Sequence, residues 1–318
     1  MNLPSPDPVQ VAVLVPCYNE EAAIATVVQA FREALPQADI YVYDNNSTDR
    51  TVAIAKEAGA RVGFESSQGK GHVVRRMFAD IEADIYLMVD GDATYDAASA
   101  PRMVALLVEQ QVDMVVGCRT ETQAEAYRPG HRFGNRLLTS SVRLLFGERF
   151  TDILSGYRAF SRRFVKSFPV LSEGFEIETE LTVHALELSM PVAEIATPYG
   201  ARPEGSTSKL RTYADGFRIL SLIARLYRNE KPLQFFSILS SLLAAAAIGL
   251  AIPVFRTYFA TGLVPRFPTA ILVTGMMVIA ALGFTCGFIL DTVTRGRKEM
   301  KKLAYLAIPS LGSRPVRS

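Results

Sequence analysis

The sequence lacks several features that would place it in a familiar class. It has no tryptophan and only three cysteines, Cys17, Cys118 and Cys286, which lie far apart and form no CxxC pair. This spacing excludes a disulfide scaffold and favours reduced, buried thiols over a metal or redox role. The first ten residues, MNLPSPDPVQ, contain neither a basic start nor an apolar run. We therefore expect no signal peptide and a catalytic part that stays in the cytosol.

The chain also has little excess of either charge sign. The 318 residues include 34 Lys and Arg against 32 Asp and Glu, a formal net charge of +2. This near-balance excludes an acidic disordered tail and argues against a broad nucleic-acid-binding surface, so we expect no nucleic-acid partner. The mean hydropathy of +0.17 is high for a soluble enzyme of this length. It fits either a uniformly apolar chain or an ordinary domain with membrane segments attached.

Two uncharged stretches near the C-terminus carry the excess hydropathy, at residues 233–255 and 269–290. Each is long enough to cross about 30 Å of hydrocarbon as a helix. The alternative is a pair of buried helices in a large soluble core, but such helices rarely run this long without a charge. The short connection predicts a hairpin, and basic residues flank its outer ends. The positive-inside bias then places both termini in the cytoplasm, although Arg256 and Arg266 in the loop weaken the contrast.

The expected organisation follows from these spans. A cytosolic domain should occupy residues 1–211, a juxtamembrane helix residues 212–231, two transmembrane helices residues 232–292 and a basic cytosolic tail residues 293–318. The juxtamembrane segment has apolar residues at helical spacing beside arginines, which suits a helix at the level of the lipid headgroups. The alternative is an ordinary surface helix packed on the domain.

Apolar runs typical of strands alternate with helical patterns over residues 11–119, which predicts an α/β fold with a mostly parallel sheet covered on both faces. Ligands bind such sheets beyond the carboxyl ends of the strands. The strands are predicted within residues 11–19, 40–49, 61–65, 84–92 and 112–119, and the helices within residues 20–35, 48–59, 70–83 and 97–111. The first helix is expected to carry Glu20 and Glu21 in its first turn.

Polar motifs follow these strands. Asp90 and Asp92, separated by Gly91, can turn toward one hard cation such as Mg²⁺ or Mn²⁺, although the same tripeptide is a common turn. The segment 44–49 offers carboxylate and amide groups to a base or ribose; an Asx turn with a helix cap explains its end equally well. Lys70, between two glycines, can meet a phosphate or lie in an ordinary loop. A P-loop and a GxGxxG motif are both missing from the sequence, which disfavours nucleotide hydrolysis and dinucleotide binding.

The combination is more specific than its parts. VPCYNEE, DNNSTD, QGKG and DGDATYD occur in this order, each at a strand end or a helix start. Together they resemble the inverting nucleotide-sugar glycosyltransferases of family 2, which have the Rossmann-like GT-A fold. TDILSGYRAFSRR, GFEIETELTVHAL and ATPYGARPEGSTSKL extend the resemblance to the dolichol-phosphate mannose synthase-like group, which charges polyprenyl phosphates. The resemblance covers residues 9–215, and the C-terminal transmembrane hairpin matches bacterial members.

The resemblance implies roles for individual residues. The metal, Mg²⁺ or Mn²⁺, would be held by Asp90 and Asp92, with the catalytic role placed on Asp92. Thr94 stands where some relatives have a glutamine ligand, so a third side-chain ligand is in doubt. Asp152, also counted as catalytic, matches the residue near the sugar, where it would orient a hydroxyl or support an arginine. The nucleotide would be bound by Pro16, Tyr18, Asn19, Glu20, Asp44, Asp49, Lys70 and Asp90.

The implied acceptor is an anionic phosphate monoester, which is already nucleophilic near neutral pH and does not require a strong base. The site must instead supply positive charge. The acceptor-phosphate candidates are Arg119, Arg136, Thr139, Arg202 and Lys209, with Arg202 also counted as catalytic. Glu176 and Glu178 are further candidates, one of which can simply cap a helix. His184 lies within a helical pattern that favours a packed core histidine. Residues 120–135 are expected to form a loop over the site.

These implications define the expected function: transfer of a sugar, from a UDP-sugar in preference to a GDP-sugar, to undecaprenyl phosphate at the cytoplasmic membrane. The expected partners are that donor, that acceptor and the bilayer. Related hairpin-anchored enzymes also suggest a homo-oligomer such as a tetramer. One alternative is polysaccharide synthesis on a hydroxyl acceptor, which usually needs a QxxRW segment that a chain without tryptophan cannot have. Another is a non-catalytic membrane scaffold built on the same fold.

Overall fold

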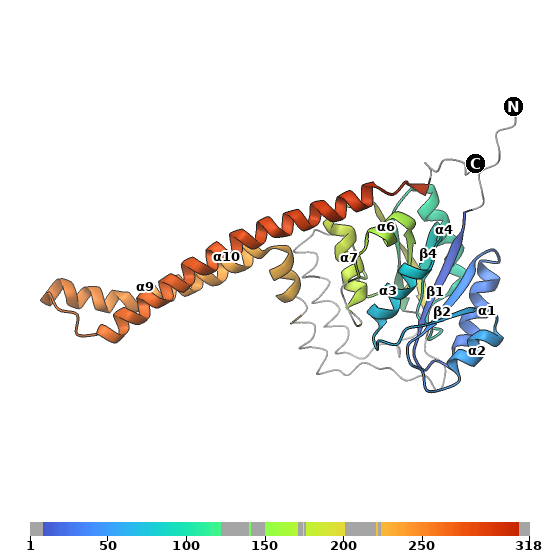
Figure 1. Cartoon of the computed structure of the whole chain (residues 1–318), viewed down its shortest axis with the longest axis horizontal. Helices are drawn as coiled ribbons and strands as arrows, with labels where there is room; N and C mark the ends of the chain where they lie inside the picture. The colour runs from blue at the N-terminus through green and yellow to red at the C-terminus, as the bar shows by residue number, and fades with distance from the viewer. Residues whose placement is uncertain are drawn as a thin grey trace, which may run out of the picture. The chain divides into compact units, whose positions relative to one another are not determined.

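The computed structural model describes residues 9–121, 150–170, 176–200 and 224–311, together with positions 140, 174 and 221. The chain divides into two compact units. The first, which we call the sheet unit, consists of Met1–Phe217 and Met300–Ser318. The second, which we call the hairpin unit, consists of Arg218–Glu299. Figure 1 traces the elements of both units along the chain.

The sheet unit is built on a seven-stranded sheet in the order β3-β2-β1-β4-β6-β5-β7. All neighbouring strands are parallel except β6, which runs antiparallel to both β4 and β5. The predicted mostly parallel α/β sheet is therefore confirmed. The strands are β1 (Val11–Cys17), β2 (Asp39–Asp44), β3 (Arg61–Phe64), β4 (Ile85–Met88), β5 (Met114–Glu121), β6 (Arg158–Ser161) and β7 (Val192–Tyr199).

Helices cover both faces of the sheet. In Figure 1, α1 and α2 lie on one side of the strands, and α3, α6 and α7 lie on the other. The helices are α1 (Ile24–Ala34), α2 (Thr51–Glu57), α3 (Lys70–Asp80), α4 (Ala100–Glu109), α6 (Arg162–Ser167) and α7 (Ile177–Glu187), and a 3₁₀ turn, η1 (Ala97–Ser99), precedes α4. Glu20 and Glu21 precede α1 rather than forming its first turn, because the chain first makes a separate turn over residues 21–23.

The strand sequences explain these two layers. Alternate residues of β1, among them Val13 and Val15, pack with Val28 of α1 in one core cluster. On the opposite face, Phe78 of α3 packs edge-to-face against Tyr86 of β4 and Phe160 of β6. Successive side chains of a strand point to opposite faces, so a nearly uninterrupted apolar strand fills both cores at once.

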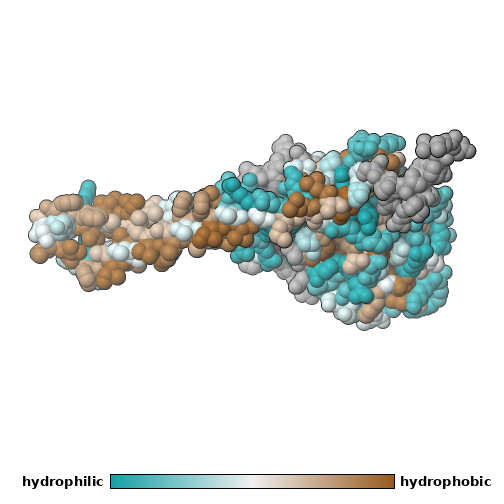
Figure 2. Space-filling view, turned by 45° about the horizontal axis from the view of Figure 1, so that its top comes forward, coloured by the Kyte–Doolittle hydropathy of each residue, from teal (hydrophilic) through white to brown (hydrophobic). Residues whose placement is uncertain are grey.

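The hairpin unit contains α9 (Pro232–Thr261) and most of α10 (Phe267–Leu306). Both helices are long and apolar enough to cross a membrane, and most of their residues are exposed. Figure 2 shows apolar side chains along the hairpin and polar ones over the sheet unit. Gly283 and Gly287 of α10 let α9 approach closely: a Cβ at the first would meet Ser240, and one at the second would meet Phe236.

The C-terminal end of the chain belongs to the sheet unit. Helix α10 continues beyond residue 292, where the tail was expected to begin, as far as Leu306. Its last turns contact the sheet unit through Lys301, which pairs with Glu187 at 2.8 Å, and Tyr305, whose hydroxyl donates to Asp113 at 2.7 Å. Both contacts lie toward the amino ends of the parallel strands, since Asp113 immediately precedes β5.

Candidate functional site

The carboxyl ends of β1 and β2 lie side by side and are joined by hydrogen bonds. Cys17 pairs in register with Asp44, and the segments that follow are cross-linked. The amide of Asn19 donates to Ser47 Oγ at 2.8 Å, and the amide of Thr48 donates to Asn19 Oδ1 at 2.8 Å. Glu20 follows the same pattern, with its amide donating to Thr51 Oγ1 at 2.8 Å. The predicted nucleotide residues Pro16, Tyr18, Asn19 and Glu20 are thus held on one rigid edge.

Asp44 and Asp49 have different environments there. Asp44 Oδ2 accepts a hydrogen bond from the Ser47 amide at 3.0 Å, whereas its buried Oδ1 has no partner among the described residues. Asp49 uses both oxygens internally, accepting from Thr51 and from the Glu21 amide. Burial would raise the pKa of Asp49, but these hydrogen bonds outweigh it and lower the pKa. Asp44 therefore has acceptor capacity for a ligand, while Asp49 braces the loop.

The turn before α3 is fixed by Asn45, which the sequence reasoning did not single out. Its side-chain amide donates to Ser67 O at 2.7 Å, and its Oδ1 accepts from the Gly69 amide at 2.7 Å. Gly69 has a φ of 137°, which disfavours any residue with a side chain. Asn45 is buried, and these two hydrogen bonds order the loop that precedes the helix of Lys70. The DNNSTD motif contained this residue, but nothing in the motif distinguished it from its neighbours.

Asp90 and Asp92 follow β4 at the centre of the same edge. Asp92 is buried, and Thr94 Oγ1 donates to its Oδ1 at 2.6 Å. Thr94 is therefore a partner of Asp92 in this structure. Asp90 retains 31% side-chain exposure. Two glycines make room around the pair, since a Cβ at Gly91 would meet Cys17 Sγ and one at Gly156 would meet the Asp90 carboxylate.

Lys70 faces this acidic pair from the start of α3. Its Nζ donates to Asp90 Oδ1 and to Glu178 Oε1, each at 2.5 Å. Burial would lower the pKa of Lys70, but the two carboxylates outweigh it and raise the pKa above its ordinary value. Lys70 therefore stays charged. Glu178 takes part in the site through this pair, whereas Glu176 stands at the N-cap of α7 without a capping side-chain hydrogen bond.

Arg119, at the end of β5, forms a bidentate ion pair with Asp152. Its Nε lies 2.7 Å from Asp152 Oδ2, and its Nη2 lies 2.8 Å from Oδ1. Burial would raise the pKa of Asp152, but Arg119 outweighs it and lowers the pKa, so the pair stays charged at neutral pH. Of the two roles implied for Asp152, the geometry corresponds to support of an arginine. The guanidinium of Arg119 also lies 5.5 Å from the centroid of the Tyr199 ring.

Behind this pair lies Arg158, another residue that the sequence reasoning missed. Its side chain is fully buried and donates to the backbone oxygens of Ile153 at 2.6 Å and Ser155 at 2.9 Å. A further donation reaches Thr182 Oγ1 at 2.9 Å. These bonds fix the 152–156 loop, which carries Asp152 and Gly156. The sequence signal was weak: Arg158 is the arginine of YRAF, residues 157–160, where apolar residues surround it.

The residues present fit a divalent cation with incomplete protein coordination. No cluster of three or more His, Cys, Asp or Glu suited to a metal occurs in the described parts of the chain. Two carboxylates that leave positions for water and a diphosphate are what Mg²⁺ needs, and Asp90 and Asp92 provide them. The carboxylate oxygens of the pair are hard ligands, the kind that Mg²⁺ and Mn²⁺ prefer. This donor set suits Mg²⁺ or Mn²⁺.

Several predicted residues fall outside the described part of the chain. These are Arg136, Thr139, Arg202 and Lys209, as well as most of the loop expected over residues 120–135 and of the helix expected over residues 212–231. His184 is described, and it is a core residue at 1% exposure, packed between Phe164 and Phe168. Burial lowers its pKa to about 3, with a further contribution from Lys301.

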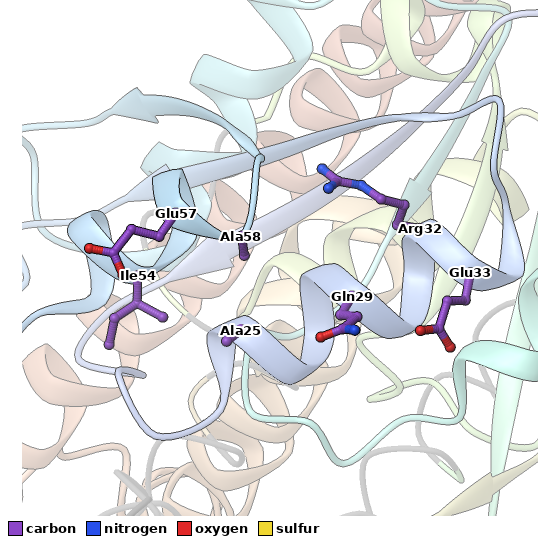
Figure 3. A pocket seen from close by; sticks show the side chains of 7 residues that line it. All are labelled: Ala25, Gln29, Arg32, Glu33, Ile54, Glu57 and Ala58. Carbon is purple, nitrogen blue, oxygen red and sulfur yellow. The ribbon is translucent and has the colours of Figure 1, made fainter.

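The structure also contains a cavity away from this edge. Its volume is about 360 Å³, and it lies between α1 and α2, lined by residues that include Gln29, Arg32 and Glu57 (Figure 3). Arg32 is committed to the backbone, since its Nη2 donates to Gly59 O at 2.8 Å. None of the residues predicted for the site lines this cavity. The candidate site therefore remains the carboxyl edge of the sheet.

Known proteins resemble this chain in sequence and fold. Residues 12–168 match the profile described as Glycosyl transferase family 2. Glycosyltransferase AglJ of Haloferax volcanii is 37% identical over 256 residues, covering 79% of this chain and 82% of that protein. The dolichyl-phosphate hexose transferase of the same organism is 28% identical over 220 residues, covering 69% of this chain and 95% of that protein.

A solved structure extends the comparison to the fold. Glucosyl-3-phosphoglycerate synthase from Mycobacterium tuberculosis, in complex with Mn²⁺, UDP and glucosyl-3-phosphoglycerate, superposes with a TM-score of 0.56. The match covers 69% of this chain and 79% of that chain at 24% identity, which establishes a shared GT-A-like fold.

Proposed function

The chain belongs to glycosyl transferase family 2, and we propose that it transfers a sugar from a nucleotide sugar to polyprenyl phosphate, with inversion in one displacement. The donor would be a UDP-sugar in preference to a GDP-sugar. The observation that carries the donor half is the edge formed by Asp44, Asp90 and Asp92. There, a buried carboxylate oxygen without a described partner lies along the same strand ends as an acidic pair open to a metal.

Asp44 is the nucleoside end of this arrangement. A buried acceptor without a partner is costly, and a donor from a base or ribose would satisfy Asp44 Oδ1. The hydrogen bonds between Asn19, Ser47 and Thr48 keep the neighbouring loops in place before any ligand arrives. Nucleotide binding at this edge thus needs little reorganisation, which lowers its cost.

Asp90 and Asp92 are the diphosphate end. They would hold Mg²⁺ or Mn²⁺, which supplies neutralisation of the negative charge on the leaving nucleoside diphosphate. Lys70 is positioned by Asp90 and Glu178 and provides a second, permanent positive charge. The structural neighbour that binds Mn²⁺ and UDP supports this assignment for the donor.

Arg119 is the described candidate for the acceptor phosphate. Asp152 holds its guanidinium in one orientation through two hydrogen bonds, and a fixed guanidinium suits a phosphate monoester. A phosphate oxygen attacks without surrendering a proton, so no carboxylate has to act as a base. Glu178, a buried carboxylate of the candidate site, is already paired with Lys70. The relative named dolichyl-phosphate hexose transferase supports a lipid phosphate acceptor.

The hairpin unit supports a membrane setting for this reaction. Its two helices have the length and composition of membrane spans. We propose that they cross the cytoplasmic membrane with the sheet unit and both termini in the cytosol. The polyprenyl chain of the acceptor would then be bound by the same bilayer.

The test uses the full chain purified in detergent with Mn²⁺ and a panel of UDP- and GDP-sugars. Undecaprenyl phosphate is the acceptor, and undecaprenol, which lacks the phosphate, is the control. We expect transfer to the phosphate and none to the alcohol. Transfer to the alcohol alone would support a hydroxyl-acceptor enzyme instead, and no transfer from any donor would overturn the proposal.

A further inference from the structure

Lys70 is shared between two carboxylates that come from distant parts of the chain. Asp90 follows β4, whereas Glu178 lies 108 residues beyond Lys70 in the first turn of α7. The side chains of Lys70 and Glu178 are almost completely buried, at 9% and 6% exposure, while Asp90 is the exposed member of the trio. The ammonium therefore has one partner inside the protein and one at the surface of the candidate metal site.

The charges around this trio do not balance locally. Asp90, Asp92 and Glu178 carry three negative charges, and Lys70 carries one positive charge. The guanidinium of Arg158 lies behind Glu178, bonded to Thr182, whose hydroxyl donates to the Glu178 backbone oxygen at 3.0 Å. Arg158 is fully buried and cannot reach a ligand. Lys70 is the cation that pairs with both Asp90 and Glu178.

A divalent cation and an ammonium compete for the same carboxylate. When Asp90 serves a metal, Lys70 loses one of its two partners, and a buried ammonium without a partner is costly. Glu178 removes that cost because it retains Lys70 on the other side. If Glu178 were neutral, Lys70 would depend on Asp90 alone and would oppose the metal more strongly.

We propose that Glu178 is a positioning residue that acts through Lys70. It makes Lys70 the counter-cation of Asp90 before a metal binds, and it keeps the ammonium beside the diphosphate afterwards. This inference rests on the proposed donor and metal site but is independent of the acceptor. Glu178 therefore helps a divalent metal to replace Lys70 as the partner of Asp90. It does not act as a base.

The chain provides a matched control at the other end of the same helix. Glu187, in the last turn of α7, is also buried and also paired with a lysine, Lys301, at 2.8 Å. That pair lies near the amino ends of the strands and touches no predicted site residue. Glu178→Gln and Glu187→Gln therefore remove the same charge from the same helix, and each leaves a lysine, buried at Lys70 and partly buried at Lys301, with one carboxylate partner fewer.

The experiment measures Mn²⁺ binding by the full chain in detergent, without nucleotide, from the electron paramagnetic resonance signal of free Mn²⁺. We expect Glu178→Gln to weaken Mn²⁺ binding about tenfold, as losses of outer-sphere partners commonly do. Glu187→Gln should bind Mn²⁺ as the native protein does. Thermal unfolding of both variants provides the measure of their common structural cost. Equal Mn²⁺ affinities in the two variants would overturn the inference.

A second variant tests the competition itself. Lys70→Met should bind Mn²⁺ more tightly than the native protein, because the competing ammonium is gone. It should also lose affinity for UDP or GDP relative to UMP or GMP, since the β-phosphate loses a cation. A merely structural lysine would weaken all of these ligands together, and that result would contradict the inference. Failure of the native protein to bind Mn²⁺ with UDP or with GDP would instead contradict the proposed donor site.

Discussion

Two buried aspartates, Asp113 just before β5 and Asp44 at the end of β2, lie at opposite ends of the parallel strands and are satisfied to different degrees. At the amino edge, Asp113 accepts four hydrogen bonds: one from Ser161, two from Arg163 and one from Tyr305. The Arg163 guanidinium also stacks on the Tyr305 ring, 4.7 Å from its centroid. Four donors on one carboxylate leave it no capacity for a ligand.

At the carboxyl edge, charges and acceptors remain available. Asp44 Oδ1 has no described partner, and Lys70 is divided between two carboxylates. Gly156 leaves room beside Asp90, because a Cβ at that position would meet the Asp90 carboxylate. Saturated carboxylates stabilise a fold, whereas incompletely satisfied ones carry a cost that a ligand can repay. The comparison teaches that a buried aspartate can be saturated and structural, as Asp113 is, or keep an acceptor for a ligand, as Asp44 does.

The largest effect is expected from Asp92→Asn. Loss of this charge at the carboxyl edge should reduce sugar transfer by at least about 10³-fold, because several kcal/mol of transition-state stabilisation by the metal is lost. The fold should persist, since Asn can still accept the hydrogen bond from Thr94. The initial rate and the circular dichroism spectrum measure the two effects. An active variant would remove Asp92 from the site.

Asp113→Asn is the corresponding change at the amino edge. It should lower the free energy of unfolding by about 3 kcal/mol, because it removes the carboxylate partner of Arg163. Donor binding in the folded fraction should not change. Chemical unfolding followed by tyrosine fluorescence measures the loss, and isothermal titration with UDP or GDP provides the control. Weakened nucleotide binding in this variant would contradict the purely structural role of Asp113.

His184, a core residue, makes the stability of the sheet unit depend on pH. Its pKa is lowered to about 3 in the folded protein, against 6.5 for the free side chain, so the unfolded chain binds more protons between these values. Stability is therefore complete above pH 6.5 and falls on acidification, by about 2 kcal/mol at pH 5. The variant His184→Asn should lack this slope when unfolding is measured from pH 7 to pH 5. A native slope retained in the variant would assign the effect to other groups.

Arg119→Lys is expected to have the smallest effect. A lysine keeps the charge beside Asp152 but cannot form the two parallel hydrogen bonds, so the acceptor phosphate should be held less well. We expect the KM for undecaprenyl phosphate to rise about tenfold, with donor affinity unchanged. A change in donor KM alone would place Arg119 at the nucleotide end instead.

Some features of this protein follow from local sequence. Strand and helix patterns over residues 11–119 predicted the elements there and the mostly parallel sheet, because the spacing of apolar residues differs between a strand and a helix. Asp44, Asp90 and Asp92 were identifiable because the ends of parallel strands meet at one edge. The antiparallel strand β6 was not predicted, since its four residues carry no distinctive period.

Pairings across the fold were beyond the reach of the sequence. Nothing in the motifs indicated that Lys70 would share its charge with Glu178, or that Asp113 would accept a hydrogen bond from Tyr305, 192 residues away. Asn45 and Arg158 were missed for the same reason, because their importance lies in which backbone groups they reach. Such contacts depend on the order of strands and the packing of helices.

The sequence by itself determined the family-2 motifs, the acidic strand ends and two apolar segments long enough to span a membrane. These are properties of neighbouring residues, so periodicity and spacing express them directly. Only the tertiary structure decided which carboxylates are saturated and which remain available to a ligand. That distinction depends on donors brought from distant segments into hydrogen-bonding distance, and no local pattern encodes it.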